Sequence, residues 1–143
     1  MKFKPQITVF LENEPGAMAK VCKLISKQNI NIDAFTVFGT VDHGVLRIIV
    51  DKPEFVLQLL ADSKLLAIQS SVIEIPVPNS PGVLYKISTA LSNEGVNVEY
   101  GYGSTNEDSE CERFFLQASD NIKAVEILKK VLADLPKTGK AKK

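Results

Sequence analysis

The sequence predicts an α+β protein built from two β-α-β-β-α-β units in tandem, each an antiparallel sheet with two helices on one face. The first observation is a repeated motif: 13–18 reads Asn-Glu-Pro-Gly-Ala-Met and 79–84 reads Asn-Ser-Pro-Gly-Val-Leu, 66 positions apart by their prolines (81 − 15). The second is an Asn fifteen residues beyond each Gly, at Asn31 (31 − 16) and Asn97 (97 − 82). Third, each motif joins a strand-like apolar run to apolar residues at helical spacing.

The first unit opens with an apolar strand and an amphipathic helix. Residues 6–11 are rich in Ile, Val, Phe and Leu, a composition typical of a buried strand. Pro15-Gly16 ends this strand, because Pro suits the first turn of a helix and Gly permits close approach of a backbone or ligand. The helix is expected over 17–27. Its apolar side chains share one face: Met18, Val21, Cys22 and Ile25.

The rest of the first unit reads as two strands, a helix and a short strand. We expect strands at 32–40 and 44–50 around the turn 41–44, a helix that starts near Pro53, and a strand at 65–68. The next apolar run, 72–77, follows with little punctuation and begins the second unit. A flexible linker between the units is therefore not expected.

The second unit repeats this order of elements. After the strand at 72–77 we expect a helix at 83–93, strands at 98–103 and 113–118, and a helix at 122–135. Gly101 and Gly103 suggest a bulge or a close approach in the first of these strands. Asn29 and its equivalent Gly95 are expected to end their helices in the left-handed conformation. The acidic run 106–110 reads as a solvated hairpin loop.

No strand-like run follows the last helix, so the second unit is expected to lack its fourth strand. The predicted boundaries are 1–70 and 71–136 for the two units and 137–143 for a flexible basic tail. This order of elements is the ferredoxin-like plan. Because one such sheet has an open face and free edges, we expect a homodimer.

Composition argues against several classes of function. The chain has 143 residues, 45% of them hydrophobic, which is enough for a core. Charges cancel, 17 against 17, and no basic stripe suggests a nucleic-acid partner. The start, 1–6, lacks a signal-peptide pattern, and no apolar run of about 20 residues suggests a membrane span. Cys22 and Cys111 have no metal-like spacing. We therefore expect a cytoplasmic protein without metal or cofactor.

The repeated motif resembles that of the ACT domain. The likeness rests on Pro-Gly at a helix start and an Asn at the next strand's entrance, inside a β-α-β-β-α-β unit, and it covers residues 6 to about 135. Two copies fused through a near-continuous strand resemble the tandem ACT proteins. The resemblance implies a regulatory, usually dimeric sensor of a free amino acid, with the ligand near the strand-to-helix turn at an interface between domains.

The resemblance also implies which residues hold the ligand. The Asn two before the Pro falls on Asn13 and Asn79, and the Asn entering the second strand on Asn31 and Asn97. Serine-binding members also have a His four before the Pro, a place that Leu11 and Val77 take here, which argues against serine. The predicted ligand-binding residues are Asn13, Glu14, Gly16, Ala17, Met18, Asn31 and Ile32 in the first unit, and Asn79, Ser80, Gly82, Val83, Leu84, Asn97 and Val98 in the second.

The chemistry of the turn agrees with a zwitterionic ligand. Backbone N–H groups at the start of a helix have no partner within the helix and suit a carboxylate. An Asn side chain offers donors and an acceptor without the cost of burying a charge. Met18 and Leu84 are candidates for the side-chain pocket. Which of the two copies is occupied stays open.

Other interpretations of the same residues stay open at this point. Pro-Gly can serve only as a turn, and Asn31 and Asn97 can each satisfy backbone groups. For Glu14 and Ser80 a side-chain helix cap is favoured over ligand contact. His43, in a predicted turn, has no visible catalytic partner. Asp33 and Glu99 follow the asparagines and read as solvated carboxylates.

Two competing functions use the same plan. The first is a trans-acting regulatory subunit of a biosynthetic enzyme, because 11–16 also resembles the small subunit of acetolactate synthase. Co-purification of a larger catalytic subunit would favour it. The second is a small enzyme such as an acylphosphatase. That resemblance fails because neither Arg47 nor Arg113 lies in the first strand-to-helix turn. The sequence therefore predicts a protein that is not an enzyme.

Overall fold

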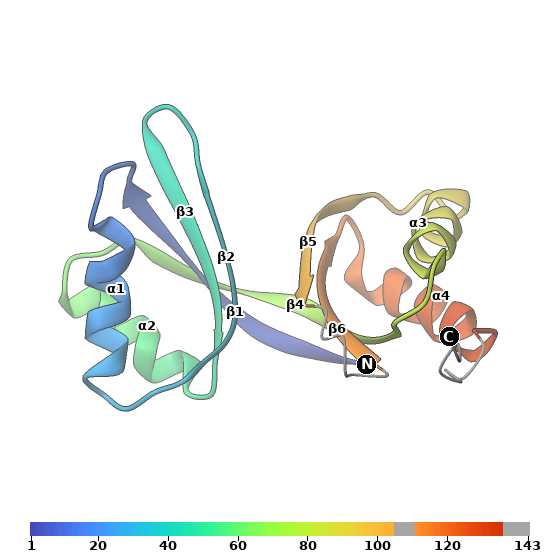
Figure 1. The fold of residues 1–143 in the computed structure, drawn as a ribbon, viewed down its shortest axis with the longest axis horizontal. Coiled ribbons are helices and arrows are strands. Elements are labelled where there is room, and N and C mark those ends of the chain that lie inside the picture. The colour runs from blue at the N-terminus through green and yellow to red at the C-terminus, as the bar shows by residue number, and fades with distance from the viewer. Residues whose placement is uncertain (105–110, 136–143) are drawn as a thin grey trace, which may run out of the picture. The chain divides into compact units, whose positions relative to one another are not determined.

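Two compact units make up the computed structural model, which describes residues 1–104 and 111–135 (Figure 1). The first unit is Lys4–Ser71; the second unit joins Met1–Phe3 to the chain from Val72 onward. The acidic run 106–110 and the tail 137–143 lie outside the described residues. Within the described part of the chain, every helix is too short or too polar to cross a membrane.

The first unit has the expected four strands and two helices. Its elements are β1 (Lys2–Glu12), α1 (Ala17–Ser26), β2 (Ile32–Gly39), β3 (His43–Val50), α2 (Pro53–Asp62) and β4 (Ala67–Pro78). The strands lie in the order β2-β3-β1-β4, and α1 and α2 cover one face (Figure 1). Ile48 on β3 pairs with Ile7 on β1 and Phe35 on β2, both antiparallel. The core between sheet and helices includes Ile7, Val9, Val21, Ile25, Leu46, Ile48, Val56 and Leu60.

The second unit reuses β4 as its first strand. The elements that follow are α3 (Val83–Asn93), β5 (Val98–Ser104), β6 (Cys111–Ala118) and α4 (Asn121–Ala133). β4 pairs antiparallel with β6, and β6 with β5. Its core includes Ile73, Ile75, Val77, Val83, Ile87, Leu91, Ala124 and Leu128. Within the described residues α4 is the last element along the chain. The predicted α+β fold of two repeated units is confirmed, but the second unit does not lack a strand next to β4, because the start of β1 belongs to it and β1 neighbours β4 in the sheet.

Two strands run further than the sequence pattern predicts. β1 begins at Lys2 rather than at residue 6. Its start belongs to the second unit, where Met1 packs against the core and Lys2 Nζ lies 3.7 Å from Glu74 Oε2. The expected strand at 65–68 begins only at Ala67 and continues through the polar residues 69–71 into the run 72–77, so that one strand, β4, includes them all. Gln6 Nε2 donates to Ser70 Oγ at 3.4 Å, which ties this polar stretch to β1.

The glycines of β5 allow a close approach to β6. A Cβ at Gly103 would overlap the ring of Phe114, and one at Gly101 would lie 3.2 Å from Leu116 Cδ1. The register shift of this strand lies between Val98 and Tyr100, before both glycines. The close approach is therefore confirmed, and a bulge at the glycines themselves is not found.

Candidate functional site

Both strand-to-helix turns use a left-handed glycine at the residue before the helix. Gly16 has φ 89° and precedes α1, and Gly82 has φ 85° and precedes α3. An L side chain rarely adopts this backbone conformation. A Cβ at either position would meet no atom within 4 Å, so the backbone angle, and not crowding, requires glycine. Asn29 (φ 55°) and Gly95 (φ 70°) are left-handed at the helix ends, as predicted.

The first turns of α1 and α3 carry no side-chain cap. Neither helix start has a side-chain hydrogen bond, whereas the Asp120 carboxylate accepts the N–H of Lys123 at the start of α4, at 2.9 Å. The expected capping role of Glu14 and Ser80 is therefore wrong. Their backbone carbonyls instead accept long bonds of 3.4 Å from the N–H of the first helical residue in each turn. No side chain of a described residue caps either helix start, and backbone N–H groups at a helix start suit an anion.

The four predicted asparagines make different contacts. Asn13 Nδ2 donates to the carbonyl of Thr40 at 2.7 Å, so its amide satisfies the backbone of the β2–β3 turn. Asn31 Nδ2 donates to Asp33 Oδ1 at 3.1 Å. Asn97 is held by its backbone, because its N–H donates to Ser119 Oγ at 3.0 Å. Asn79 is exposed, and its amide has no hydrogen bond to another described residue. Among the described residues, neither the Asn31 amide nor the Asn97 amide donates to a turn carbonyl.

Within one unit the two asparagines do not meet. Asn13 precedes α1 and Asn31 follows it, and a helix of 10 residues is about 15 Å long at roughly 1.5 Å per residue. The same holds for Asn79 and Asn97, which flank the 11 residues of α3. A free amino acid cannot span that distance. One unit alone therefore offers half of the predicted constellation.

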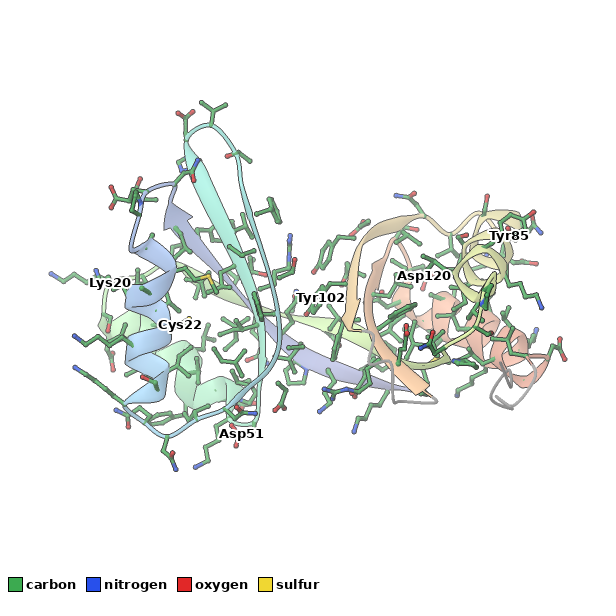
Figure 2. The ribbon with its side chains drawn as sticks, in the orientation of Figure 1. Lys20, Cys22, Asp51, Tyr85, Tyr102 and Asp120 are labelled. Atoms are coloured by element: carbon green, nitrogen blue, oxygen red, sulfur yellow. The ribbon has the colours of Figure 1, made fainter. Side chains whose placement is uncertain are left out.

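A hollow of ≈ 390 Å³ lies beside the first turn. Glu14 and Ala17, two of the predicted residues, line it. The other lining residues are Phe10, Leu11, Glu12, Lys20, His43, Lys64, Leu65 and Leu66. The hollow is thus lined by apolar side chains together with cationic and anionic groups. Lys20 projects from α1 in Figure 2. A second hollow, of ≈ 370 Å³, includes Asn97 and Val98 and lies by the C-terminal half of α3.

The remaining predicted residues divide between core and surface. Ala17, Met18 and Ile32 are half-buried against the core of the first unit. Val83 is buried in the second core, so it can offer a ligand only its backbone N–H. Leu84 is 63% exposed, and its neighbour Tyr85 is 73% exposed. Figure 2 shows Tyr85 on α3. Leu84 is therefore free to contact something outside its own unit.

Several residues of the first hollow escaped the sequence-based prediction. Lys64 and Leu66 come from the connection between α2 and β4, far along the chain from the motif. Lys64 is left-handed, with φ 60°. A non-glycine residue in this conformation is uncommon, but a lysine in the sequence gives no sign of it. Lys20 lies on α1 outside the predicted apolar face, and the sequence pattern assigned it no role in binding.

These features define a tandem βαββαβ protein with twin uncapped helix starts. A family model of the ACT domain pair matches residues 2–135, and the chain belongs to this family. ACT domain pairs are regulatory domains. Among curated proteins, none matches the chain.

Solved structures agree with this assignment. Protein BT0572 from Bacteroides thetaiotaomicron is similar at 34% identity, with a TM-score of 0.83 over 90% of this chain and 88% of that one. The ligand-free regulatory subunit of aspartate kinase from Thermus thermophilus is similar at 19% identity, with a TM-score of 0.65 over 92% and 97%. The corresponding subunit from Thermus flavus is 17% identical, with a TM-score of 0.61 over 91% and 95%. The last two likenesses concern the fold alone.

Proposed function

We propose that this chain is a non-catalytic regulatory protein that binds a free L-amino acid beside its strand-to-helix turns and so regulates amino-acid metabolism. The observation that carries the proposal is the uncapped start of α1 and α3, each behind a left-handed glycine. The N–H groups of such a helix start and its dipole favour a carboxylate, by about 0.3–1 kcal/mol at an exposed site.

The hollow beside the first turn supports a zwitterionic ligand. Lys20 and Lys64 supply cations for a carboxylate, and Glu12 and Glu14 supply acceptors for an ammonium group. Leu11 and Leu66 add apolar surface for a side chain. Its ≈ 390 Å³ falls within the range of about 300–1,000 Å³ typical of ligand pockets.

A homodimer is part of the proposal, because one unit alone cannot bring both asparagines to one ligand. If Asn13 and Asn31 contact the same amino acid, they belong to different copies of the chain. β2 offers a surface for such an association: it has a neighbour, β3, on one side within its unit, and Phe35, Val37 and Phe38 are exposed on it at 56%, 44% and 44%. Exposed apolar edge strands favour association.

A thermal-shift screen of the twenty amino acids at millimolar concentration tests the proposal. A ligand that binds only the folded state stabilises it by RT ln(1 + [L]/Kd), or about 2.7 kcal/mol at a hundredfold excess over Kd. We expect at least one amino acid to raise Tm by several degrees. The same amino acid should bind at least about tenfold more weakly to the double variant Asn31→Ala, Asn97→Ala. A flat screen would contradict the proposed function, and full affinity in the folded double variant would contradict the residue assignment.

A further inference from the structure

Glu112 is a buried carboxylic acid in the second unit, with an exposed fraction of 6%. It is the second residue of β6, where it lies directly opposite Val77 of β4. No hydrogen bond or ion pair joins its side chain to another residue of 1–104 or 111–135. A buried carboxylate needs compensating donors or a favourable dipole.

The strand register fixes the face of the sheet on which Glu112 lies. Side chains directly opposite each other in an antiparallel pair point to the same face. Val77 packs in the core of the second unit together with Val83, the first residue of α3. Glu112 therefore lies on the helix-covered face, at the end of the sheet where α3 begins. The uncapped start of α3 follows β4 at this end of the sheet, after the four-residue connection 79–82.

The first unit has no side chain at the equivalent place. Leu11 corresponds to Val77, two residues before each Asn of the motif, and Leu11 lies directly opposite Gly44. Gly44 is therefore the counterpart of Glu112. A Cβ built on Gly44 would have Leu11 Cβ, at 3.4 Å, as its nearest atom, which is ordinary van der Waals contact. The first unit therefore accommodates a Cβ at this position and does not carry one.

We propose that Glu112 makes the two turns unequal, so that an amino-acid carboxylate binds at the start of α1 and is excluded from the start of α3. In the second unit the Glu112 carboxylate takes the favourable place beside the helix N-terminus, and its charge repels another anion. In the first unit Gly44 leaves that place open. This inference rests on the proposed amino-acid binding and determines which copy is the sensor.

The acids beside the first turn do not act in the same way. Glu12 and Glu14 are exposed, so water screens their charge and their side chains can turn away. Lys20 and Lys64 line the same hollow and offset them. Glu112 is buried, so its charge is held at one place.

A reciprocal exchange between the two positions tests the inference. The probe is the amino acid that raises Tm of the unchanged protein most, and the measurement is stoichiometry and Kd by isothermal titration calorimetry on the full chain. We expect one molecule bound per chain. Gly44→Glu should weaken this binding at least about tenfold, a change of about 1.4 kcal/mol. Gly44→Gln, equal in size but uncharged, should change it less than about threefold. Glu112→Gly should raise the stoichiometry to two per chain.

The outcomes separate the inference from the proposed function. Equal loss of affinity in Gly44→Glu and Gly44→Gln would show a steric effect and overturn the inference. Loss of binding in Glu112→Gln would overturn it too, because Glu112 would then hold the ligand's ammonium group. If Gly44→Glu does not fold, the stoichiometry of Glu112→Gly decides the question. If no amino acid binds to the unchanged protein or to Glu112→Gly, the proposed function fails and the inference with it.

Discussion

The left-handed backbone at Gly16 gives a prediction at the scale of a single residue. Gly16→Ala places a Cβ in open space but in an unfavourable conformation, so it should lower the free energy of unfolding by about 1–2 kcal/mol. Urea unfolding measures the change. Gly44→Ala is the matched control in the same unit, because Gly44 lies in β3, and we expect it to be neutral or slightly stabilising. Equal stability of Gly16→Ala and the unchanged protein would contradict the prediction.

Residue types that impose a backbone conformation could be predicted from the sequence, and side-chain partners could not. Asn29 and Gly95 are left-handed where the repeat indicated, whereas the left-handed backbone of Gly16 and Gly82 was not predicted, although both glycines belong to the repeated motif. The partner of Asn13 is the carbonyl of Thr40, in a hairpin turn 27 residues away. No local pattern encodes that contact, because it depends on how β2 and β3 pass beside the end of β1.

The cap of α4 gives a prediction at the scale of an element. Asp120 accepts the N–H of Lys123 at 2.9 Å and is the residue before the helix. Asp120→Ala leaves a helix N–H without this acceptor and should lower the free energy of unfolding by about 0.5–2 kcal/mol. Asp120→Asn keeps an acceptor and should cost less. Glu126→Ala, which removes an exposed carboxylate from the same helix, is the control and should stay within about 0.5 kcal/mol. Thermal unfolding compares the three variants.

Helices could be placed from the sequence more closely than strands. Their periodicity and turn residues are local, so α3 spans 83–93 as predicted. β1 and β4 extend beyond their apolar runs, because strands end where pairing ends and pairing is set by distant residues. The hollow beside the first turn was missed for the same reason: it needs the α2–β4 connection to return beside β1, where the N–H of Phe10 donates to the carbonyl of Leu66 at 2.9 Å.

At the scale of the whole molecule, two strands each belong to both units. β1 spans Lys2–Glu12, and the boundary between the units falls after Phe3. β4 spans Ala67–Pro78, and the boundary falls after Ser71. The sequence indicated the second crossing, through its unpunctuated run, but not the first. Because a strand end cannot detach without losing part of its own ladder, unfolding of one unit should disturb the other.

This sharing of strands predicts that the chain unfolds in one transition. The protein has no Trp and three Tyr, at positions 85, 100 and 102, all in the second unit. Tyrosine fluorescence therefore reports on the second unit, while far-UV circular dichroism reports on both. We expect the two signals to give the same midpoint in urea, the test for two-state behaviour. Separate midpoints would show that each unit folds alone.

A chain lacking residues 1–3 should still unfold in a single transition, but the midpoint should fall at a lower urea concentration. The reason is that Met1 no longer packs against the second core and Lys2 no longer pairs with Glu74.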